Sequence, residues 1–346
     1  MTEHADNPPR VSVVVPVRGD EPNIGKCLRS ILDGALPEHQ LEVIIADGGG
    51  SAGTMKVVSA LAEEHPCVRV VPNPGRIAPT GFNAGIKASR GQAICILSAH
   101  SYLDTDYLAK CLDVLEREEV DVAGGPMVTL SGADSLQSSM VRNITSSRFG
   151  MGSSFRTLRR DGPVDTVVFG VYRRSVFEKI GLFDERLVRN QDNELNSRLR
   201  SNGGRVWMVA GTSSYYYSRQ SIGKLLRQNF RNGMYCILTW RLNPGSFVLR
   251  HAVPLLFVLL LILGGIAAAA LPVLRYLYLG ILGLYGVLAV LASLQVGLRS
   301  RSLLAFLLPV AFATLHVTYG LGSLIGILRF CFRRIKRPGP EKLSSV

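Results

Sequence analysis

The sequence predicts an α/β protein built on a mostly parallel sheet and followed by an α-helical membrane region. In the first two thirds of the chain, apolar strand segments alternate with segments that carry apolar residues at helical spacing. From Ala252 to Leu328 the only charged residues are Arg275, Arg299 and Arg301. They leave three uncharged runs, each about the 20 residues that cross hydrocarbon as a helix.

The elements of the first region follow from local pattern. Runs rich in β-branched residues predict strands, and apolar residues at helical spacing predict helices. Continuous apolar strands separated by helices indicate a parallel sheet covered on both faces, which binds ligands at the carboxyl ends of its strands. The loops after Val17, Asp47 and Leu97 should therefore form one rim. The predicted strands are Val11–Val17, Leu41–Asp47, Val68–Pro72 and Ala93–His100, and the predicted helices are Ile24–Leu32, Thr54–Glu64 and Tyr107–Glu118.

Composition limits the class of protein. The chain has 346 residues, is 47% hydrophobic and carries a net charge of +13, so it is too apolar on average for a soluble enzyme. Its start, MTEHADNPPR, is polar, so we expect no signal peptide and a cytosolic first domain. The six cysteines have no paired spacing, which argues against a zinc site or a disulfide framework.

A pair of carboxylates begins the predicted helix within RNQDNELNSRLRSNGGRVW. Asp192 and Glu194 lie where the unpaired backbone N–H groups of a helix start favour negative charge, and Gly203-Gly204 end the helix. Such residues cap a helix or act as catalytic carboxylates. The sequence around them leaves both interpretations open.

A glycine-rich segment, GGGSAG, follows the second predicted strand. It matches the dinucleotide-binding pattern, but that pattern belongs after the first strand, and Asp47 would place a carboxylate beside the pyrophosphate. A carboxylate at a strand end is better placed to accept a hydrogen bond from a base N–H such as that of uracil. The glycines would then let the chain turn tightly beneath it.

The motifs occur in a distinctive order: VSVVVPVRGDEPNIGKCLRSIL, VIIADGGGSAGT, NPGRIAPTGFNAGIKASRGQAICILSAHSYL, VDTVVFGVYRRSVFEKIGLFDERLVRNQDNELNSRLRSNGGRVW and LLRQNFRNG. This order resembles family 2 glycosyltransferases of the GT-A fold, a Rossmann-like architecture. The likeness covers about Val11 to Gly233 and is nearest to the membrane-anchored branch typified by succinoglycan-biosynthesis glucosyltransferases. It divides the chain into a disordered start (1–10), a GT-A domain (11–215), interfacial amphipathic helices (216–249), about three membrane helices (250–328) and a basic tail (329–346).

The resemblance implies donor-binding residues. Pro16, Val17 and Asp47 would line the base pocket. Arg76 and Asn83 would lie near the donor, where a guanidinium matches pyrophosphate oxygens. The alternatives are that Arg76 is a solvated loop residue and that Asn83 orders its loop.

The metal motif of the family falls at Ser98-Ala99-His100, where relatives have a first carboxylate. Here Ser98, a donor-side residue, replaces it, so His100 would ligate Mn²⁺ or Mg²⁺ with help from the diphosphate, or would be a core histidine. The resemblance therefore implies a divalent cation that binds weakly or is dispensable. Asp104-Thr105-Asp106 also has the spacing of a metal motif, but we expect it to cap the following helix.

The resemblance also implies catalytic roles. Asp192 would be the single general base of an inverting transfer, with Glu194 and Gln191 in support. Gln228 and Arg231 would contact the acceptor or diphosphate. Asn232 replaces a tryptophan that is typical of processive synthases, which favours addition of one sugar.

The membrane region contains a topological conflict. Three crossings from a cytosolic domain would put the C-terminal side outside, yet residues 329–338 are strongly basic and should stay inside. One apolar run would then be re-entrant or interfacial, and the last run, interrupted by Pro309 and His316, is the suspect. Residues 218–235 combine basic and apolar side chains in a way that suits a helix in the headgroup layer.

The sequence thus predicts a multi-pass cell-membrane glycosyltransferase of the hexosyltransferase class. It would move a sugar from a nucleotide-sugar donor, UDP-linked by expectation, to a lipid-linked or growing glycan acceptor in polysaccharide biosynthesis. Assembly proteins are expected partners and nucleic acid is not. The alternative is a non-catalytic GT-A-like component of a polysaccharide assembly complex, for which Ser98 is the support.

Overall fold

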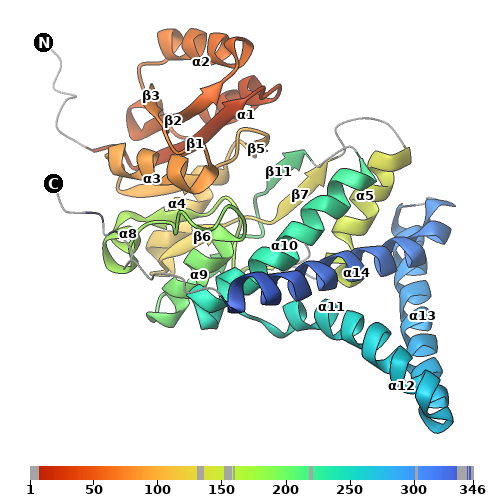
Figure 1. Cartoon of the computed structure of the whole chain (residues 1–346). Helices are drawn as coiled ribbons and strands as arrows, with labels where there is room; N and C mark the ends of the chain where they lie inside the picture. The colour runs from red at the N-terminus through yellow and green to blue at the C-terminus, as the bar shows by residue number, and fades with distance from the viewer. Residues whose placement is uncertain are drawn as a thin grey trace, which may run out of the picture. The chain divides into compact units, whose positions relative to one another are not determined.

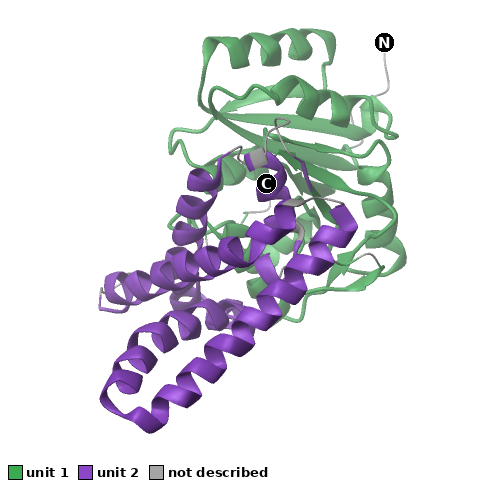
Figure 2. Ribbon diagram, turned by 90° about the vertical axis from the view of Figure 1, so that its right-hand side faces the viewer, with its two compact units in different colours: residues 1–128, 154–217, 337–346 green, residues 129–153, 218–336 purple. Residues whose placement is uncertain are grey.

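The computed structural model describes residues 8–130, 136–151, 158, 160–217, 221–300, 303–332, 341 and 343. The chain divides into two compact units (Figure 2). Unit 1 comprises residues 1–128, 154–217 and 337–346, and unit 2 comprises residues 129–153 and 218–336.

Unit 1 is built on an eight-stranded sheet with the order β3-β2-β1-β4-β9-β6-β10-β8. Its first four strands in that order are parallel, and β9 runs antiparallel between β4 and β6. The carboxyl ends of β1, β2 and β4 therefore share one edge, as predicted. The strands are β1 (Val11–Gly19), β2 (Leu41–Gly50), β3 (Val68–Pro72), β4 (Ala93–Ile96), β6 (Val122–Gly124), β8 (Gly162–Pro163), β9 (Val171–Arg173) and β10 (Val206–Met208).

Each face of the sheet has its own hydrophobic core. Side chains alternate along a strand, so Val13 and Val15 of β1 pack on one face, with Leu28 and Leu108, while Val14 packs on the other with Ile86. Helices therefore cover both faces, as a parallel sheet requires. The first face carries α1 (Ile24–Leu32), α2 (Ala52–Glu64) and α4 (Tyr107–Arg117), and the second carries α3 (Ala78–Ala88), α8 (Arg174–Ile180) and α9 (Gln191–Ser201) (Figure 1).

Helix α3 is the main element that the sequence did not predict. Its glycines, Gly81 and Gly85, are weak helix formers, so the segment reads as a loop. In the fold they let the helix approach β1 closely: a Cβ at Gly81 would lie 2.8 Å from Pro16 Cβ, and one at Gly85 would overlap Val14. Close packing on the sheet outweighs the low intrinsic propensity.

A second sheet has the order β5-β11-β7. Its strands β5 and β11 are antiparallel. The strands are β5 (Ser101–Leu103), β11 (Ser214–Tyr217) and β7 (Met127–Leu130).

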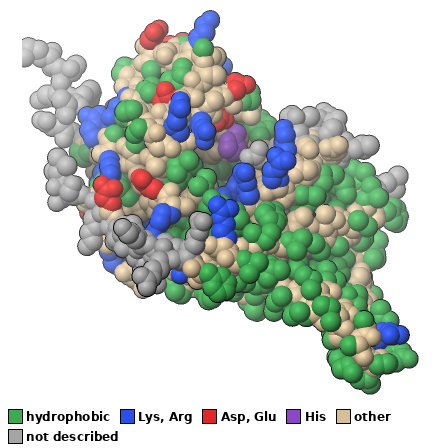
Figure 3. Space-filling view, viewed as in Figure 1, with side chains coloured by type: hydrophobic (Ala, Val, Ile, Leu, Met, Phe, Trp, Pro, Cys, Tyr) green, Lys and Arg blue, Asp and Glu red, His purple; other side chains and the backbone are tan. Residues whose placement is uncertain are grey.

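Unit 2 is helical. Three of its segments are long and apolar enough to cross a membrane: Leu249–Ala270, Pro272–Ser300 and Leu304–Cys331. In the view of Figure 3, hydrophobic side chains cover most of the surface of this unit. Its helices are α5 (Leu136–Ser146), α6 (Arg148–Met151), α10 (Ile222–Leu242), α11 (Leu249–Leu259), α12 (Gly265–Ala270), α13 (Pro272–Ser300) and α14 (Leu308–Gly326), with π-helical turns at Leu260–Gly264 and Ile327–Cys331.

The division at residues 129–153 differs from the single domain 11–215 that we expected. Val141 and Ile144 of α5 are buried against Leu225 of α10 and Phe312 of α14. Contacts distant in sequence therefore place α5 with the later helices. Local pattern gives no sign of such contacts.

Candidate active site

Asp47 lies at the carboxyl end of β2 and closes a tight turn. Its Oδ1 accepts hydrogen bonds from the backbone N–H groups of Gly49 (2.8 Å) and Gly50 (2.7 Å). Gly49 has φ +97°, a conformation that glycine adopts without strain. One carboxylate oxygen thus holds the turn, and the side chain remains partly exposed at the edge of the sheet.

Arg76 lies over this glycine turn. Its Nε donates to the carbonyl oxygen of Gly48 at 3.1 Å, and a Cβ at Gly49 would come within 2.8 Å of Arg76 Nη2. Arg76 is exposed and has φ +56°. The loop that carries it is fixed by Asn73, whose backbone N–H donates to the carbonyl of Asp47 at 2.8 Å. The guanidinium is thereby held next to the turn.

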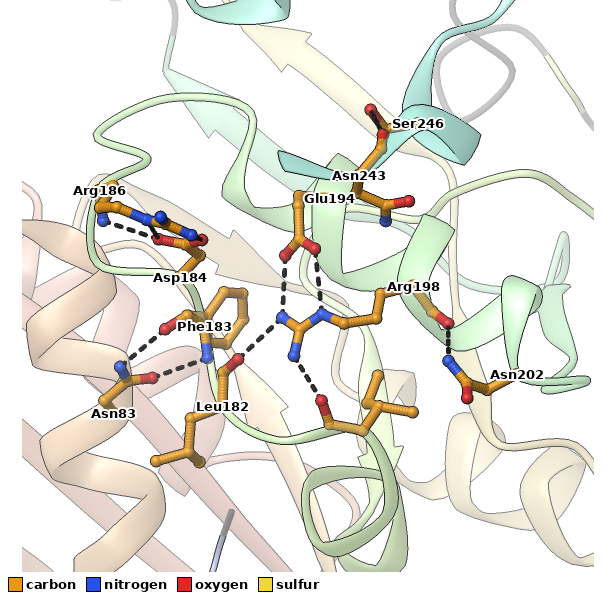
Figure 4. Close-up of polar contacts among 11 residues, drawn as sticks. Asn83, Leu182, Phe183, Asp184, Arg186, Glu194, Arg198, Asn202, Asn243 and Ser246 are labelled. Atoms are coloured by element: carbon orange, nitrogen blue, oxygen red, sulfur yellow. Dashed lines mark hydrogen bonds and ion pairs between the residues drawn. The ribbon is translucent and has the colours of Figure 1, made fainter. Parts of the chain in front are cut away.

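The other predicted donor residues have different environments. Pro16 is partly exposed, whereas the Val17 side chain is buried in the core, so only the Val17 backbone can face a ligand. Asn83, buried on α3, donates to the carbonyl of Phe183 at 3.0 Å and accepts from its N–H at 2.9 Å (Figure 4). Asn83 thus connects α3 to the segment before α9.

Ser98 and His100 lie together after β4. The Ser98 hydroxyl is 3.0 Å from His100 Nδ1, and the His100 ring packs edge-on against Tyr216 with centroids 4.9 Å apart. In the part of the chain that the structure describes, no group of three or more His, Cys, Asp or Glu side chains gathers where it could hold a metal ion. The protein therefore offers one imidazole and one hydroxyl here, which suits a cation held mainly by a diphosphate.

The tyrosines beside this loop were not singled out in the sequence. Tyr102 stacks on Tyr215 with centroids 4.6 Å apart, and Lys26 lies 3.9 Å from the centroid of the Tyr102 ring while donating to the Tyr217 hydroxyl at 2.8 Å. The consecutive tyrosines in SYYY were the available signal. Tyr215 pairs with Tyr102, which lies 113 positions earlier in the chain, so the cluster forms only after folding.

The acidic residues at 104–106 do not cap α4 through their side chains. Asp106 occupies the position before the helix, but its Oδ1 accepts from the Thr212 hydroxyl at 2.7 Å and its Oδ2 pairs with Lys110 at 2.7 Å. Asp104 accepts from the backbone N–H of Ser213 at 2.8 Å. Both carboxylates join the helix start to the loop before β11.

Asp192 lies in the first turn of α9. Burial raises the pKa of its carboxyl above the usual range, and the backbone N–H groups of Asn193 and Asp192 offset this only in part. The residue nevertheless retains some solvent exposure. It is therefore a carboxylate with enhanced basicity that a ligand can still reach.

Glu194, two residues further along in the same first turn, has a different environment. Its side chain is buried and forms a bidentate pair with Arg198, at 3.0 Å (Nε to Oε1) and 2.8 Å (Nη2 to Oε2) (Figure 4). Arg198 also donates to the carbonyl of Leu182 at 2.8 Å. Glu194 thus positions the segment before α9, while Gln191 begins the helix.

A buried network holds α9 on the sheet. The hydroxyl of Tyr172 on β9 donates to Asn196 at 3.1 Å, and Asn196 donates to the Thr166 hydroxyl at 2.9 Å. Tyr172 lies close enough to Asp192 for their charges to interact. Because the Ile96 N–H donates to Gly170 at 3.2 Å, the start of β9 meets the carboxyl end of β4. Asp192 thus lies in the first turn of a helix that this network holds against β9, the strand next to β4.

Strained backbone marks the same edge. Among the described residues, the non-glycine residues with positive φ are Arg76, Glu119, Phe169 and Asn190. Asn190 directly precedes α9, and Phe169 lies two residues before β9. Such conformations persist only where surrounding structure enforces them, and they occur often at functional sites.

Gln228 and Arg231 lie on α10 in unit 2. Arg231 is exposed. Their role toward acceptor or diphosphate stays a prediction.

A doubly covered α/β sheet with a glycine turn after β2, a His-bearing loop after β4 and an acidic helix start agrees with the GT-A class of glycosyltransferases. Residues 12–181 match the family described as Glycosyl transferase family 2. The chain thus carries a family 2 glycosyltransferase domain and is a glycosyltransferase.

Two curated relatives are involved in glycan biosynthesis. The dolichyl N-acetyl-alpha-D-glucosaminyl phosphate 3-beta-D-2,3-diacetamido-2,3-dideoxy-beta-D-glucuronosyltransferase of Methanococcus voltae is 26% identical over 326 residues, covering 92% of this chain and 97% of that protein. Succinoglycan biosynthesis protein ExoA of Rhizobium meliloti (strain 1021) is 28% identical over 248 residues, covering 70% of this chain and 74% of that protein.

Solved structures confirm the fold class. The mannosyltransferase PcManGT from Pyrobaculum calidifontis, in complex with GDP-Man and Mn²⁺, superposes with a TM-score of 0.57 at 18% identity, covering 92% of this chain and 88% of that chain. S. aureus TarS 1-349 in complex with UDP-GlcNAc superposes with a TM-score of 0.51 at 14% identity, covering 91% and 90%. The predicted fold class and family are thus confirmed.

Proposed function

We propose that the protein is an inverting, membrane-anchored glycosyltransferase that moves one sugar from a nucleotide donor to a lipid-linked glycan acceptor. The observation that carries the proposal is the contrast on α9. Asp192 is partly accessible and has a raised pKa, whereas Glu194 is buried and neutralised by Arg198. Of these two carboxylates on α9, one is available, which suits inversion, since a retaining double displacement needs a second carboxylate as nucleophile.

In this reaction the acceptor hydroxyl oxygen attacks the anomeric carbon while the bond from that carbon to the diphosphate oxygen breaks. The hydroxyl proton passes to the Asp192 carboxylate, and the nucleoside diphosphate leaves with the bonding electrons. The raised pKa makes Asp192 a stronger base than an exposed aspartate. Its retained exposure leaves room for the acceptor.

The donor would bind across the carboxyl edge of the sheet. The uncommitted oxygen of Asp47 suits a base N–H, which favours a uracil nucleotide, and the Arg76 guanidinium suits the diphosphate. A divalent cation bound by His100 would neutralise diphosphate charge, with Ser98 contributing only a neutral hydroxyl. PcManGT was solved with Mn²⁺, which supports a cation in this position.

The acceptor and location rest on two further observations. The Methanococcus voltae relative acts, by its name, on a dolichyl-phosphate-linked sugar. Unit 2 has three segments long and apolar enough to cross a membrane. Both support a multi-pass protein whose catalytic domain works on a lipid-linked acceptor at the cytosolic face.

The test is the variant Asp192→Asn, which keeps the size of the side chain and removes its basicity. Transfer should fall at least about 100-fold while donor binding, measured by calorimetry, is retained. Glu194→Gln is the matched control on the same helix: it should lower stability and leave the pH dependence of transfer unchanged. Near-normal turnover of Asp192→Asn would exclude Asp192 as the base. A wild-type protein that binds donor but never transfers would support the non-catalytic alternative.

A further inference from the structure

The geometry points to a bilayer topology that the proposed membrane anchoring leaves open. We propose that only two helical segments cross the membrane, α11–α12 and α13. In this topology α14 lies with α10 along an anionic headgroup surface. The chain then returns to the side of the catalytic domain.

Helices α10 and α14 run side by side in the same direction (Figure 1). A Cβ at Gly233 would overlap the carbonyl of Tyr319, and one at Gly326 would lie 2.7 Å from the carbonyl of Met234. Asn229 donates to the carbonyl of Leu315 at 2.6 Å. The residue numbers of the contacting positions increase together along both helices, so the two helices are parallel. They therefore have the same orientation relative to the bilayer.

Helix α10 is not a transmembrane segment. Lys224, Arg227 and Arg231 are exposed along one side of it, whereas Leu225 and Asn229 are buried on the side toward α14. Placing these three cations in the hydrocarbon core would cost about 2.5–3.5 kcal/mol for each residue near the bilayer centre. A basic row with an apolar back fits anionic headgroups.

The middle of α14 lies level with the start of α11. Arg250, in the first turn of α11, is close enough to act electrostatically on Tyr319. A Cβ at Gly320 would overlap the carbonyl of Pro254. If α14 crossed upright, its midpoint would be at the bilayer centre and Arg250 would be there with it.

The crossing hairpin is formed by α11–α12 and α13. Phe257 stacks on Tyr285 with centroids 4.3 Å apart, and a Cβ at Gly264 would lie 3.2 Å from Tyr278, so the two arms are antiparallel. Its bend is at Leu271, which is 55% exposed. Helix α14 packs on α11 and α13, and the distal helix α12 packs chiefly on α13.

The end of the chain gives independent support. The Leu182 N–H donates to the carbonyl of Glu341 at 3.0 Å, the Glu341 carboxylate pairs with Lys87 at 2.6 Å, and Leu343 packs on a core cluster of unit 1. All of these contacts lie within the catalytic unit. Residue 341 must therefore be on the same side of the membrane as the catalytic domain, which requires an even number of crossings.

Epitope tags at both ends of the full chain test the topology. The protein is placed in sealed vesicles with the catalytic domain facing outward, which is checked by the binding of nucleotide added outside. We expect added protease to digest both tags. Leu271→Cys should resist an impermeant maleimide until detergent is added. The background variant Cys67→Ser/Cys331→Ser removes the partly exposed cysteines and leaves the buried ones.

Depth measurements test the position of α14. A fluorophore at Val310→Cys, Leu321→Cys or Leu328→Cys should be quenched more by shallow than by deep lipid-borne quenchers. Gly283→Cys on α13 is the matched control and should show the reverse, because a Cβ there would meet no described atom within 4 Å apart from its chain neighbours and the backbone of its own helix.

A protected C-terminal tag beside a digested N-terminal tag would overturn the proposal. So would labelling of Leu271→Cys in sealed vesicles, or deep quenching at Leu321→Cys. Protein that fails to float with vesicles would instead refute the membrane anchoring itself.

Discussion

The two ends of the central sheet carry buried carboxylates with opposite properties. At the amino end, Glu42 is 2% exposed and accepts from the N–H of Arg90 (2.8 Å) and from Arg69 (2.9 Å). Burial raises its pKa, but the hydrogen bonds from Ser12 and Arg90 and the charge of Arg69 together bring it below the usual range. Near the carboxyl end, backbone N–H groups are the donors to Asp192 within the part of the chain that the structure describes, and the pKa of Asp192 is raised by burial.

The comparison shows how burial becomes either stability or reactivity. A buried carboxylate surrounded by enough donors is held as an anion and joins strands together. A buried carboxylate with too few donors has a raised pKa and therefore accepts a proton readily. Under the proposed function, the sheet holds strands together at one end and carries the general base near the other.

The largest expected effect separates the two residues by activity and stability together. Asp192→Asn should lose at least about 100-fold in transfer yet unfold at the same or a higher temperature, because it removes an under-compensated buried charge. Thermal unfolding monitored by circular dichroism, alongside initial rates, measures both. A lower unfolding temperature would mean that Asp192 is structural like Glu42.

Glu42→Gln should show the opposite behaviour. Removing its charge weakens the hydrogen bonds that Ser12, Arg69 and Arg90 donate to it and should lower the free energy of unfolding by about 1–3 kcal/mol. Turnover per folded molecule should be unchanged, because the residue lies at the other end of the sheet. Glu63→Gln, an exposed change on α2, is the control and should have little effect.

The two pKa directions predict opposite pH responses. Since the folded pKa of Glu42 is lowered, its stabilisation is present above the unfolded pKa and is lost as pH falls through the folded pKa. Since the pKa of Asp192 is raised, transfer should fall with acidification at a pH above that expected for an ordinary aspartate. Urea unfolding and rates measured across the acid range should therefore give separate profiles. An acid limb unchanged in Asp192→Asn would contradict the assignment.

A smaller effect is expected at the departure from the usual metal motif. Ser98→Asp adds a carboxylate beside His100 and should tighten Mn²⁺-dependent donor binding, whereas His100→Ala should weaken it. Calorimetric titration of a UDP-sugar with and without Mn²⁺ distinguishes the variants. Equal, metal-independent binding by all three proteins would assign charge neutralisation to side chains such as Arg76.

Sequence reasoning located much of the sheet but not the partners of its side chains. The helix Ile24–Leu32 and the strand Val68–Pro72 have the predicted bounds, because each is a short, strongly patterned segment. Helix α3 was not predicted, because its glycines lower the helix propensity of the segment. Close packing against the sheet forms the helix in spite of that low propensity. The i, i+4 spacing of Glu194 and Arg198 is compatible with an ion pair, but only the structure shows that the pair forms and is buried.

By itself the sequence determined the fold class, the family and the position of the three apolar segments, since these depend on periodicity, motif order and length. Only the tertiary structure decided which carboxylate is available, where residues 129–153 belong and which way α14 runs beside α10. Those outcomes depend on hydrogen bonds and close contacts between residues far apart in the chain. The composition of a single segment therefore cannot predict them.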